Sequence, residues 1–259
     1  MPRHGKPGPI RLPLAPKVRP PLPEGIARIY QSCYKVNRQG GTPASSLAQR
    51  MEAWLHRQVA ADVAADRSPR TTLELGAGTL NQLPFEPAVG PYDIVEPFTA
   101  LFEDSPLLER VRHAYADIEE VPPDARYDRI TSVATLEHVC NLPELLATAA
   151  LLLAPGGTFR AAIPSEGTPL WTLGWRLTTG LEFRLRHGLD YGQLMRHEHV
   201  NTAREIEGLL RYFFAEVEMR TFGPSRRLSL YQFLACRGPD LGRSEAYLAE
   251  LARAARPTA

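Results

Sequence analysis

The chain has 259 residues, of which 44% are hydrophobic and 23% charged, and its formal net charge is +1. This length suits one large α/β domain, the apolar fraction excludes wholesale disorder, and the near-neutral charge gives no general bias toward nucleic acid. The three cysteines form no CxxC pair, no apolar run is long enough to cross a bilayer, and the N-terminus lacks the apolar stretch of a secretory signal. We therefore expect a cytoplasmic protein without a membrane span.

Residues 1–23 differ in composition from the rest of the chain. They hold eight of the 24 prolines and five basic side chains but no carboxylate. The remainder has 25 basic and 29 acidic residues, a net charge of −4. Because proline lacks the amide hydrogen that helices and central strands need, this segment is predicted to be a disordered arm. A strap over the domain or a contact with a partner is the alternative.

An N-terminal helical cap is expected at residues 24–66. Thr42 and Pro43 suit the start of a helix, and apolar side chains then recur at helical spacing as far as Val63. From Thr71 onward, short apolar segments alternate with helical patterns, which is typical of a parallel sheet covered on both faces.

An α/β domain is expected at residues 67–238, with a doubly wound, mostly parallel sheet of seven strands. Prolines and glycines after Gly78 leave little room for a regular helix in the first crossover. A helix interrupted near Pro106 is expected at 98–111, a helix at 141–153, and a helix and tail at 239–259. The strands are expected at 72–75, 92–95, 112–116, 127–133, 158–163, 216–222 and 229–236.

An insertion at residues 165–200 follows the fifth strand and interrupts this alternation. It is rich in Trp, Arg and His, and its aromatic and arginine side chains suit a sugar, a phosphate or an aromatic acceptor. The same aromatic residues could equally form the hydrophobic core of a helical cap. We interpret the insertion as the substrate-binding part of the chain.

The sequence LELGAGT, which ends at Thr79, carries the clearest chemical signal. A strand that runs into a GxG turn lets the backbone approach a ligand, because glycine adds no Cβ. Glu96 ends the next strand, where a carboxylate can accept both hydroxyls of a ribose, and Asp117 ends the third. The third glycine of the dinucleotide fingerprint is replaced by Asn81, which disfavours NAD.

The chain resembles the class I S-adenosylmethionine-dependent methyltransferases of the small-molecule type over about residues 71–236. The resemblance rests on ELGAGT at 74–79, the acid at 96, AD at 116–117, LEHV at 136–139 and LAPGG at 153–157. It implies S-adenosyl-L-methionine as the cofactor. Its methionine part would contact Glu74, Gly76 and Gly78, its ribose Glu96, its adenine Asp117 and Ile118, and its sulfonium Leu136 and Glu137. The pattern departs from the family at Leu80, where a further glycine is common.

Three histidines are candidate catalytic residues, because an oxygen acceptor usually has to lose a proton and histidine is the natural base near neutral pH. His138 follows Glu137 beside the expected cofactor site, and His197 and His199 flank Glu198. Structural hydrogen bonding is the alternative for each of them. His197 and His199 could also be half of a metal site that Glu137 or His138 completes. Nothing in the sequence specifies an ion, so the predicted site contains no metal.

These features predict a methyltransferase for a small-molecule acceptor such as a sugar, a glycolipid or a secondary metabolite, with O-methylation favoured. One alternative is a methyltransferase for RNA or another nucleic acid. The net charge of −4 of the chain after residue 23 weighs against it, because nucleic acids are negatively charged. The other alternative is a cofactor-binding scaffold without catalysis, which the missing glycine favours and the acids at 74, 96 and 117 disfavour. The sequence does not specify an oligomeric state.

Overall fold

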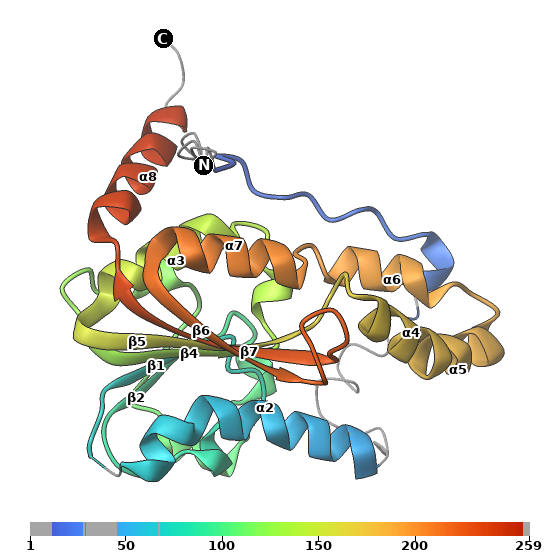
Figure 1. Cartoon of the computed structure of the whole chain (residues 1–259), viewed down its shortest axis with the longest axis horizontal. Helices are drawn as coiled ribbons and strands as arrows, with labels where there is room; N and C mark the ends of the chain where they lie inside the picture. Colours follow the sequence, from blue (N-terminus) through green and yellow to red (C-terminus); the bar gives the residue numbers. More distant parts are fainter. Residues whose placement is uncertain (1–11, 28, 30–45, 67, 256–259) are drawn as a thin grey trace, which may run out of the picture.

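The computed structural model describes residues 12–27, 29, 46–66 and 68–255. A seven-stranded sheet runs through the molecule in the order β3-β2-β1-β4-β5-β7-β6 (Figure 1). Strands β1 to β5 pair in parallel, while β7 is antiparallel to both of its neighbours. The expected doubly wound, mostly parallel sheet is therefore confirmed. The strands are β1 (Thr72–Leu75), β2 (Tyr92–Val95), β3 (His113–Tyr115), β4 (Tyr127–Val133), β5 (Leu153–Pro164), β6 (Phe214–Phe222) and β7 (Tyr231–Pro239).

One face of the sheet is covered by α3 (Leu142–Leu152) and α7 (Ala203–Phe213), and α8 (Leu241–Ala254) packs beside α3 (Figure 1). Apolar side chains of these helices interlock with the central strands in the largest buried cluster of the described residues. A capping box is present at the start of α7, where Thr202 and Glu205 exchange hydrogen bonds. These helices hold the carboxyl ends of the strands in place.

The other face is covered by the N-terminal helix α2 (Ser46–Ala65) (Figure 1). Leu55 and Val59 of α2 are buried against β5 and β7. Asp62 of α2 also pairs with Arg129 of β4 at 2.9 Å and with Arg160 of β5 at 3.2 Å. The first crossover contains only a short 3-10 helix, Leu83–Phe85, as its prolines and glycines predict. The N-terminal helix thus covers a face that this crossover leaves without an α-helix.

The segment 98–111 is interrupted at Pro106 as expected, but it is not α-helical. Two 3-10 helices, Thr99–Leu101 and Pro106–Arg110, take its place. Pro106 interrupts the pattern because its ring and missing amide are incompatible with a helix interior. Ser105 instead caps the second 3-10 helix by accepting a hydrogen bond from the backbone amide of Leu107.

The described part of the N-terminal arm, residues 12–23, lies along the domain as a strap. It runs from α8 past α7 to α6 (Figure 1). The Pro13 carbonyl accepts a hydrogen bond from the Tyr247 hydroxyl, and Lys17 binds the Val200 carbonyl and Glu205. Proline content only showed that the segment lacks secondary structure of its own, and tertiary contacts hold it. The remainder of the arm, 1–11, lies outside the described residues.

The insertion folds into three short helices beyond the end of β5, namely α4 (Pro169–Leu177), α5 (Thr179–His187) and α6 (Tyr191–Glu198) (Figure 1). They form a lobe at the end of the sheet and not a layer over either face. Among the described helices, none has both the length and the apolar character needed to cross a bilayer.

Candidate functional site

A cavity of about 490 Å³ opens at the carboxyl ends of the parallel strands. The ends of β1, β2 and β4 and the segment after β3 contribute to its wall. Six residues that the sequence assigned to the cofactor line it together: Glu74, Gly76, Gly78, Glu96, Asp117 and Ile118. Open α/β sheets bind their ligands at this edge.

The glycine turn after β1 depends on two different properties of glycine. Gly76 has φ +73°, and a Cβ on it would lie 2.3 Å from Oγ1 of Thr135. Gly78 has φ +53°, but a Cβ there would meet no atom within 4 Å. Leu80 adopts φ +65° and is fully buried, so the position that departs from the family pattern keeps a glycine-like backbone. The turn therefore leaves open space at Gly78 on the wall of the cavity.

Two acidic side chains are fixed beside this turn by backbone amides. Glu96 is only 4% exposed, and its carboxylate accepts hydrogen bonds from the amides of Gly78 at 2.8 Å and Phe98 at 3.1 Å. Asp117 caps the 3-10 helix Ile118–Glu120 through the amide of Glu119. Each carboxylate retains oxygen lone pairs for the hydroxyl or amino groups of a ligand.

Glu74 is a buried acid at the end of β1, and Tyr92 donates a hydrogen bond to it at 2.9 Å. Burial raises the pKa of Glu74 to about 8, although the bond from Tyr92 acts in the opposite direction. A cationic group in the cavity would favour the ionised carboxylate. Glu74 can therefore hold a positively charged part of a ligand.

The structure separates Leu136 and Glu137 from the other predicted cofactor residues. Leu136 is fully buried in the main hydrophobic cluster, and neither residue lines the cavity, although Thr135 and His138 do. The 3-10 helix Leu136–His138 turns successive side chains in different directions. Glu137 points instead toward two histidine rings.

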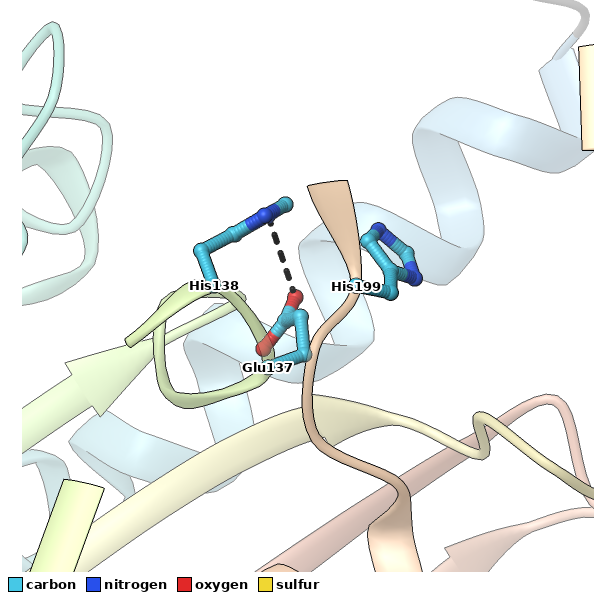
Figure 2. A group of neighbouring side chains, drawn as sticks. All are labelled: Glu137, His138 and His199. Atoms are coloured by element: carbon cyan, nitrogen blue, oxygen red, sulfur yellow. Dashed lines mark ion pairs between the residues drawn. The ribbon is translucent and has the colours of Figure 1, made fainter. Parts of the chain in front are cut away.

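Glu137, His138 and His199 form a compact group beside the cavity (Figure 2). One ligand atom of each residue lies within 4.8 Å of the others, and the two imidazole centroids are 4.9 Å apart. Figure 2 shows Glu137 directing its carboxylate toward the space between the rings. The amides of Val200 and Asn201 donate to the Glu137 carbonyl, which joins the two distant segments. We call these three residues the Glu–His–His cluster.

Hydrogen bonds fix the ring orientation of both histidines. Nδ1 of His138 lies 2.9 Å from the Glu198 carbonyl, and a carbonyl can only accept, so Nδ1 is the donor. Nδ1 of His199 lies 2.7 Å from the carboxylate of Glu166. Burial lowers the pKa of His199, but the bond to Glu166 and the nearby Glu137 and Glu198 carboxylates outweigh it and raise this pKa above 6.5. Nε2 of each neutral ring is then left as an acceptor.

His197, the third candidate, lies apart from this cluster. It belongs to the last turn of α6, and its Nδ1 approaches the Pro20 carbonyl of the strap at 2.7 Å. The sequence hypothesis of a shared face for His197 and His199 is wrong because residues 191–198 are helical and not extended.

A second cavity of about 680 Å³ lies within the insertion, between α4, α5 and α6. His199 and Glu166 belong to its wall, whereas His138 belongs to the wall of the first cavity. The two histidines therefore stand between the edge of the sheet and the insertion. Trp171 adds to this boundary, since its indole nitrogen donates to Glu166 and its ring stacks on His199 at 6.4 Å.

Sequence reasoning missed Arg19, Glu166 and Asn201. Arg19 donates to the carbonyls of His138, His197 and Glu198 from the strap. The amide of the Asn201 side chain donates to the carbonyls of Leu136 and Val139. No motif in the sequence singles out Glu166 or Asn201. For Arg19 there was a signal, because residues 1–23 contain no carboxylate and this cation therefore has to find its acceptors in a distant part of the chain.

Comparisons with known proteins agree with this architecture. The family model described as a methyltransferase domain matches residues 44–213, which is more than half of the chain. No curated protein matches the chain in sequence.

Among known structures, the 1,6-didemethyltoxoflavin-N1-methyltransferase of Burkholderia thailandensis, with bound 1,6-didemethyltoxoflavin and S-adenosylhomocysteine, is 20% identical with a TM-score of 0.56. The match covers 86% of this chain and 94% of that one. The N-methyltransferase NodS of Bradyrhizobium japonicum, in complex with S-adenosylhomocysteine, is 15% identical with a TM-score of 0.52, over 82% and 98% of the two chains. The CurJ carbon methyltransferase is 19% identical with a TM-score of 0.56, over 84% and 62%. These likenesses show the fold, and the family match shows that the chain belongs to the methyltransferase-domain family and is a methyltransferase.

Proposed function

We propose that this enzyme transfers the methyl group of S-adenosyl-L-methionine to a hydroxyl group of a small-molecule acceptor. The observation that carries the proposal is the position of His138 and His199 between two cavities, one at the edge of the sheet and one in the insertion. A donor on one side and an acceptor on the other would meet beside a pair of bases.

The donor assignment is supported by the chemistry of the first cavity. Glu96 offers carboxylate oxygens for ribose hydroxyls, Gly78 leaves room for a ligand, and the buried Glu74 suits a cationic amino group. Structurally similar methyltransferases hold S-adenosylhomocysteine. Leu136 is withdrawn from the proposed binding residues because its side chain lies in the hydrophobic core.

The acceptor assignment is supported by the wall of the second cavity. Trp175 and Tyr191 provide aromatic surfaces, and Arg176, Arg184 and Arg196 provide hydrogen-bond donors. Within the described part of the chain, the indole nitrogen of Trp175 is buried without a hydrogen-bond partner. Such a wall suits a sugar, a glycolipid or an aromatic secondary metabolite with oxygen substituents.

S-adenosyl-L-methionine would supply a methyl group that is already activated by its sulfonium. In the transfer, a lone pair of the acceptor oxygen would form the new C–O bond while the C–S bond breaks. The electron pair of the C–S bond would remain on sulfur. Nε2 of His199 would receive the hydroxyl proton, because Nδ1 is already bonded to Glu166. The neighbouring carboxylates favour the resulting imidazolium. His138 would orient the acceptor from the side of the first cavity.

A screen with methyl-labelled S-adenosyl-L-methionine tests the function. The panel contains hydroxylated sugars, glycolipids, phenols, amines and RNA, and the product is analysed by mass spectrometry and by the chemical shift of the new methyl group. We expect label in an O-methyl group of a small molecule. Label in an amine, in carbon or in RNA would contradict the O-methylation proposal.

The variant His199→Gln tests the proton-accepting role. We expect its turnover to fall by about 100-fold or more, since positioned acid–base groups typically contribute 10²–10⁴-fold. The affinity for S-adenosylhomocysteine should change little. Unchanged turnover would show that His199 has only a structural role.

We also propose a cytoplasmic location, because the described cysteines, Cys140 and Cys236, are free thiols.

A further inference from the structure

We propose that the Glu–His–His cluster binds a divalent transition-metal ion, with zinc-like chemistry, through Glu137, His138 and His199. The sequence predicts a metal-free site, and its alternative was a pair of His197 and His199 completed by Glu137 or His138. The tertiary structure leaves His197 out and brings the other three together. Two imidazoles and one carboxylate are an established ligand set for zinc, with a fourth position open to water or a substrate.

The first argument is the state of Glu137. Its side chain is 1% exposed, and within the described residues its Oε2 has no hydrogen-bond partner. Its Oε1 lies 3.7 Å from Nε2 of His138. An ionised carboxylate with an unpartnered oxygen is costly in such a buried place. A cation between Glu137 and the two rings would compensate the charge of this buried carboxylate.

The second argument is the hydrogen bonding of the two imidazoles. Histidines that bind a metal usually donate their other ring nitrogen to a carboxylate or a backbone carbonyl, which orients the ring and sets the tautomer. Nδ1 of His138 does this toward the Glu198 carbonyl at 2.9 Å, and Nδ1 of His199 toward Glu166 at 2.7 Å. Both Nε2 lone pairs therefore remain for an ion. Glu166 is itself held by the indole nitrogen of Trp171 at 2.6 Å.

The third argument is the size of the cluster. The ligand atoms lie within 4.8 Å of one another, whereas tetrahedral ligands at zinc distances are about 3.4 Å apart. The ligand atoms would have to approach one another by up to about 1.4 Å, which side-chain rotations can supply. The backbone already holds the segments together, because the amides of Val200 and Asn201 donate to the Glu137 carbonyl.

An ion at this place would deepen the proposed function, and only this consequence rests on that function. Its open position would face the boundary between the two cavities, where it could bind the acceptor hydroxyl and lower the pKa of that group. With Nε2 of His199 bound to the ion, that nitrogen would no longer accept the proton, and the acceptor hydroxyl would release it to solvent water.

Direct binding to the full chain tests the site independently of turnover. The protein is freed of metals with a chelator and titrated with Zn²⁺, Mn²⁺ and Mg²⁺ by calorimetry. We expect one ion per chain and tighter binding of Zn²⁺ than of Mg²⁺, since nitrogen ligands favour zinc. Co²⁺ should give the visible absorption of a tetrahedral site. No binding of Zn²⁺ would overturn the proposal.

Matched variants locate the site. Glu137→Gln and His138→Ala should each weaken Zn²⁺ binding by about 100-fold or more, and Glu166→Gln by about 10–100-fold because it acts through His199. His197→Gln should bind Zn²⁺ as the parent does, since its ring faces the strap. Circular dichroism of each variant confirms folding. Equal affinity in all four variants would place the ion elsewhere and overturn the assignment.

The outcomes for metal and function are separable. Methyl transfer that persists in chelator, with no Zn²⁺ binding, would remove the metal proposal and leave the proposed function intact. Zn²⁺ binding that depends on Glu137 and His138, without transfer to any acceptor, would support the metal site and contradict the function.

Discussion

The two walls of the site are assembled in different ways. The cofactor wall draws most of its residues from one short stretch, between Glu74 and Ile118, where consecutive parallel strands end at the same edge. The Glu–His–His cluster and its supports come from the strap, the loop after β4 and the insertion, with Arg19 and His199 lying 180 positions apart. The residues of the cofactor wall follow one another closely in the sequence and are therefore visible there as a motif. The residues of the cluster are far apart in the sequence and form no such motif.

The difference also concerns how each wall is stabilised. Backbone conformation and amide hydrogen bonds hold the cofactor wall, as the glycine turn and Glu96 show. Long-range hydrogen bonds hold the cluster, because the carbonyls of His138, His197 and Glu198 all accept from Arg19. Substitutions in the two walls should therefore have separable effects on cofactor binding and on the acceptor side.

The largest expected effect comes from Gly76→Ala in the cofactor wall. The new Cβ would lie 2.3 Å from Thr135 Oγ1 at a residue with φ +73°. Overpacking and a left-handed non-glycine backbone together should cost about 2–5 kcal/mol of unfolding free energy and abolish S-adenosylhomocysteine binding. Gly78→Ala is the matched control, because it has similar φ but open space and should cost only about 1 kcal/mol. Equal losses in chemical denaturation would contradict the steric explanation.

Glu96→Ala should weaken S-adenosylhomocysteine binding by about 1–3 kcal/mol, because charge-assisted hydrogen bonds to the ribose and the hold on the Gly78 amide are both lost. Calorimetry measures this change. Zn²⁺ binding should be unaffected, since Glu96 lies in the other wall. An unchanged cofactor affinity would show that the ribose binds elsewhere.

Arg19→Ala should loosen the strap and lower the free energy of unfolding by about 1–2 kcal/mol, since three carbonyls lose a charged donor. Methyl transfer should fall more than cofactor affinity. Arg237→Ala is the control, because its pair with Glu218 is solvent-exposed and should contribute less than about 1 kcal/mol. If the two variants are equally stable in urea, the strap does not support the cluster.

A pH-dependent effect on stability is expected from Glu74→Gln. The raised pKa of about 8 means that the folded protein keeps a proton that the unfolded chain releases above about pH 4.5. Parent stability therefore falls as pH rises from about 4.5 to 8, and the variant lacks this loss. The difference in thermal midpoint between variant and parent should grow from pH 5 to pH 8. A constant difference would show that Glu74 is already ionised at pH 5.

Sequence reasoning was most successful where short-range patterns decide the outcome. Each of the seven strands overlaps its expected range, although β5 begins at Leu153 and not at 158. Strand ends and the family resemblance identified six residues that line the first cavity. At 98–111 it foresaw the interruption at Pro106 but not that both pieces are 3-10 helices. It also did not foresee that the Leu136 side chain lies in the core, because the direction of a side chain within a 3-10 turn depends on which neighbours bury it.

The sequence by itself indicated the class of the enzyme through motifs that resemble a known family. Hydrophobic period and local turn chemistry indicated the succession of strands along the chain and the edge of the sheet where the cofactor is proposed to bind. Only the tertiary structure decided that the strap crosses the domain, that His199 rather than His197 joins His138, and that Glu137 completes their cluster. The physical reason is that these contacts depend on hydrogen bonds between segments far apart in the chain, and no local spacing encodes them.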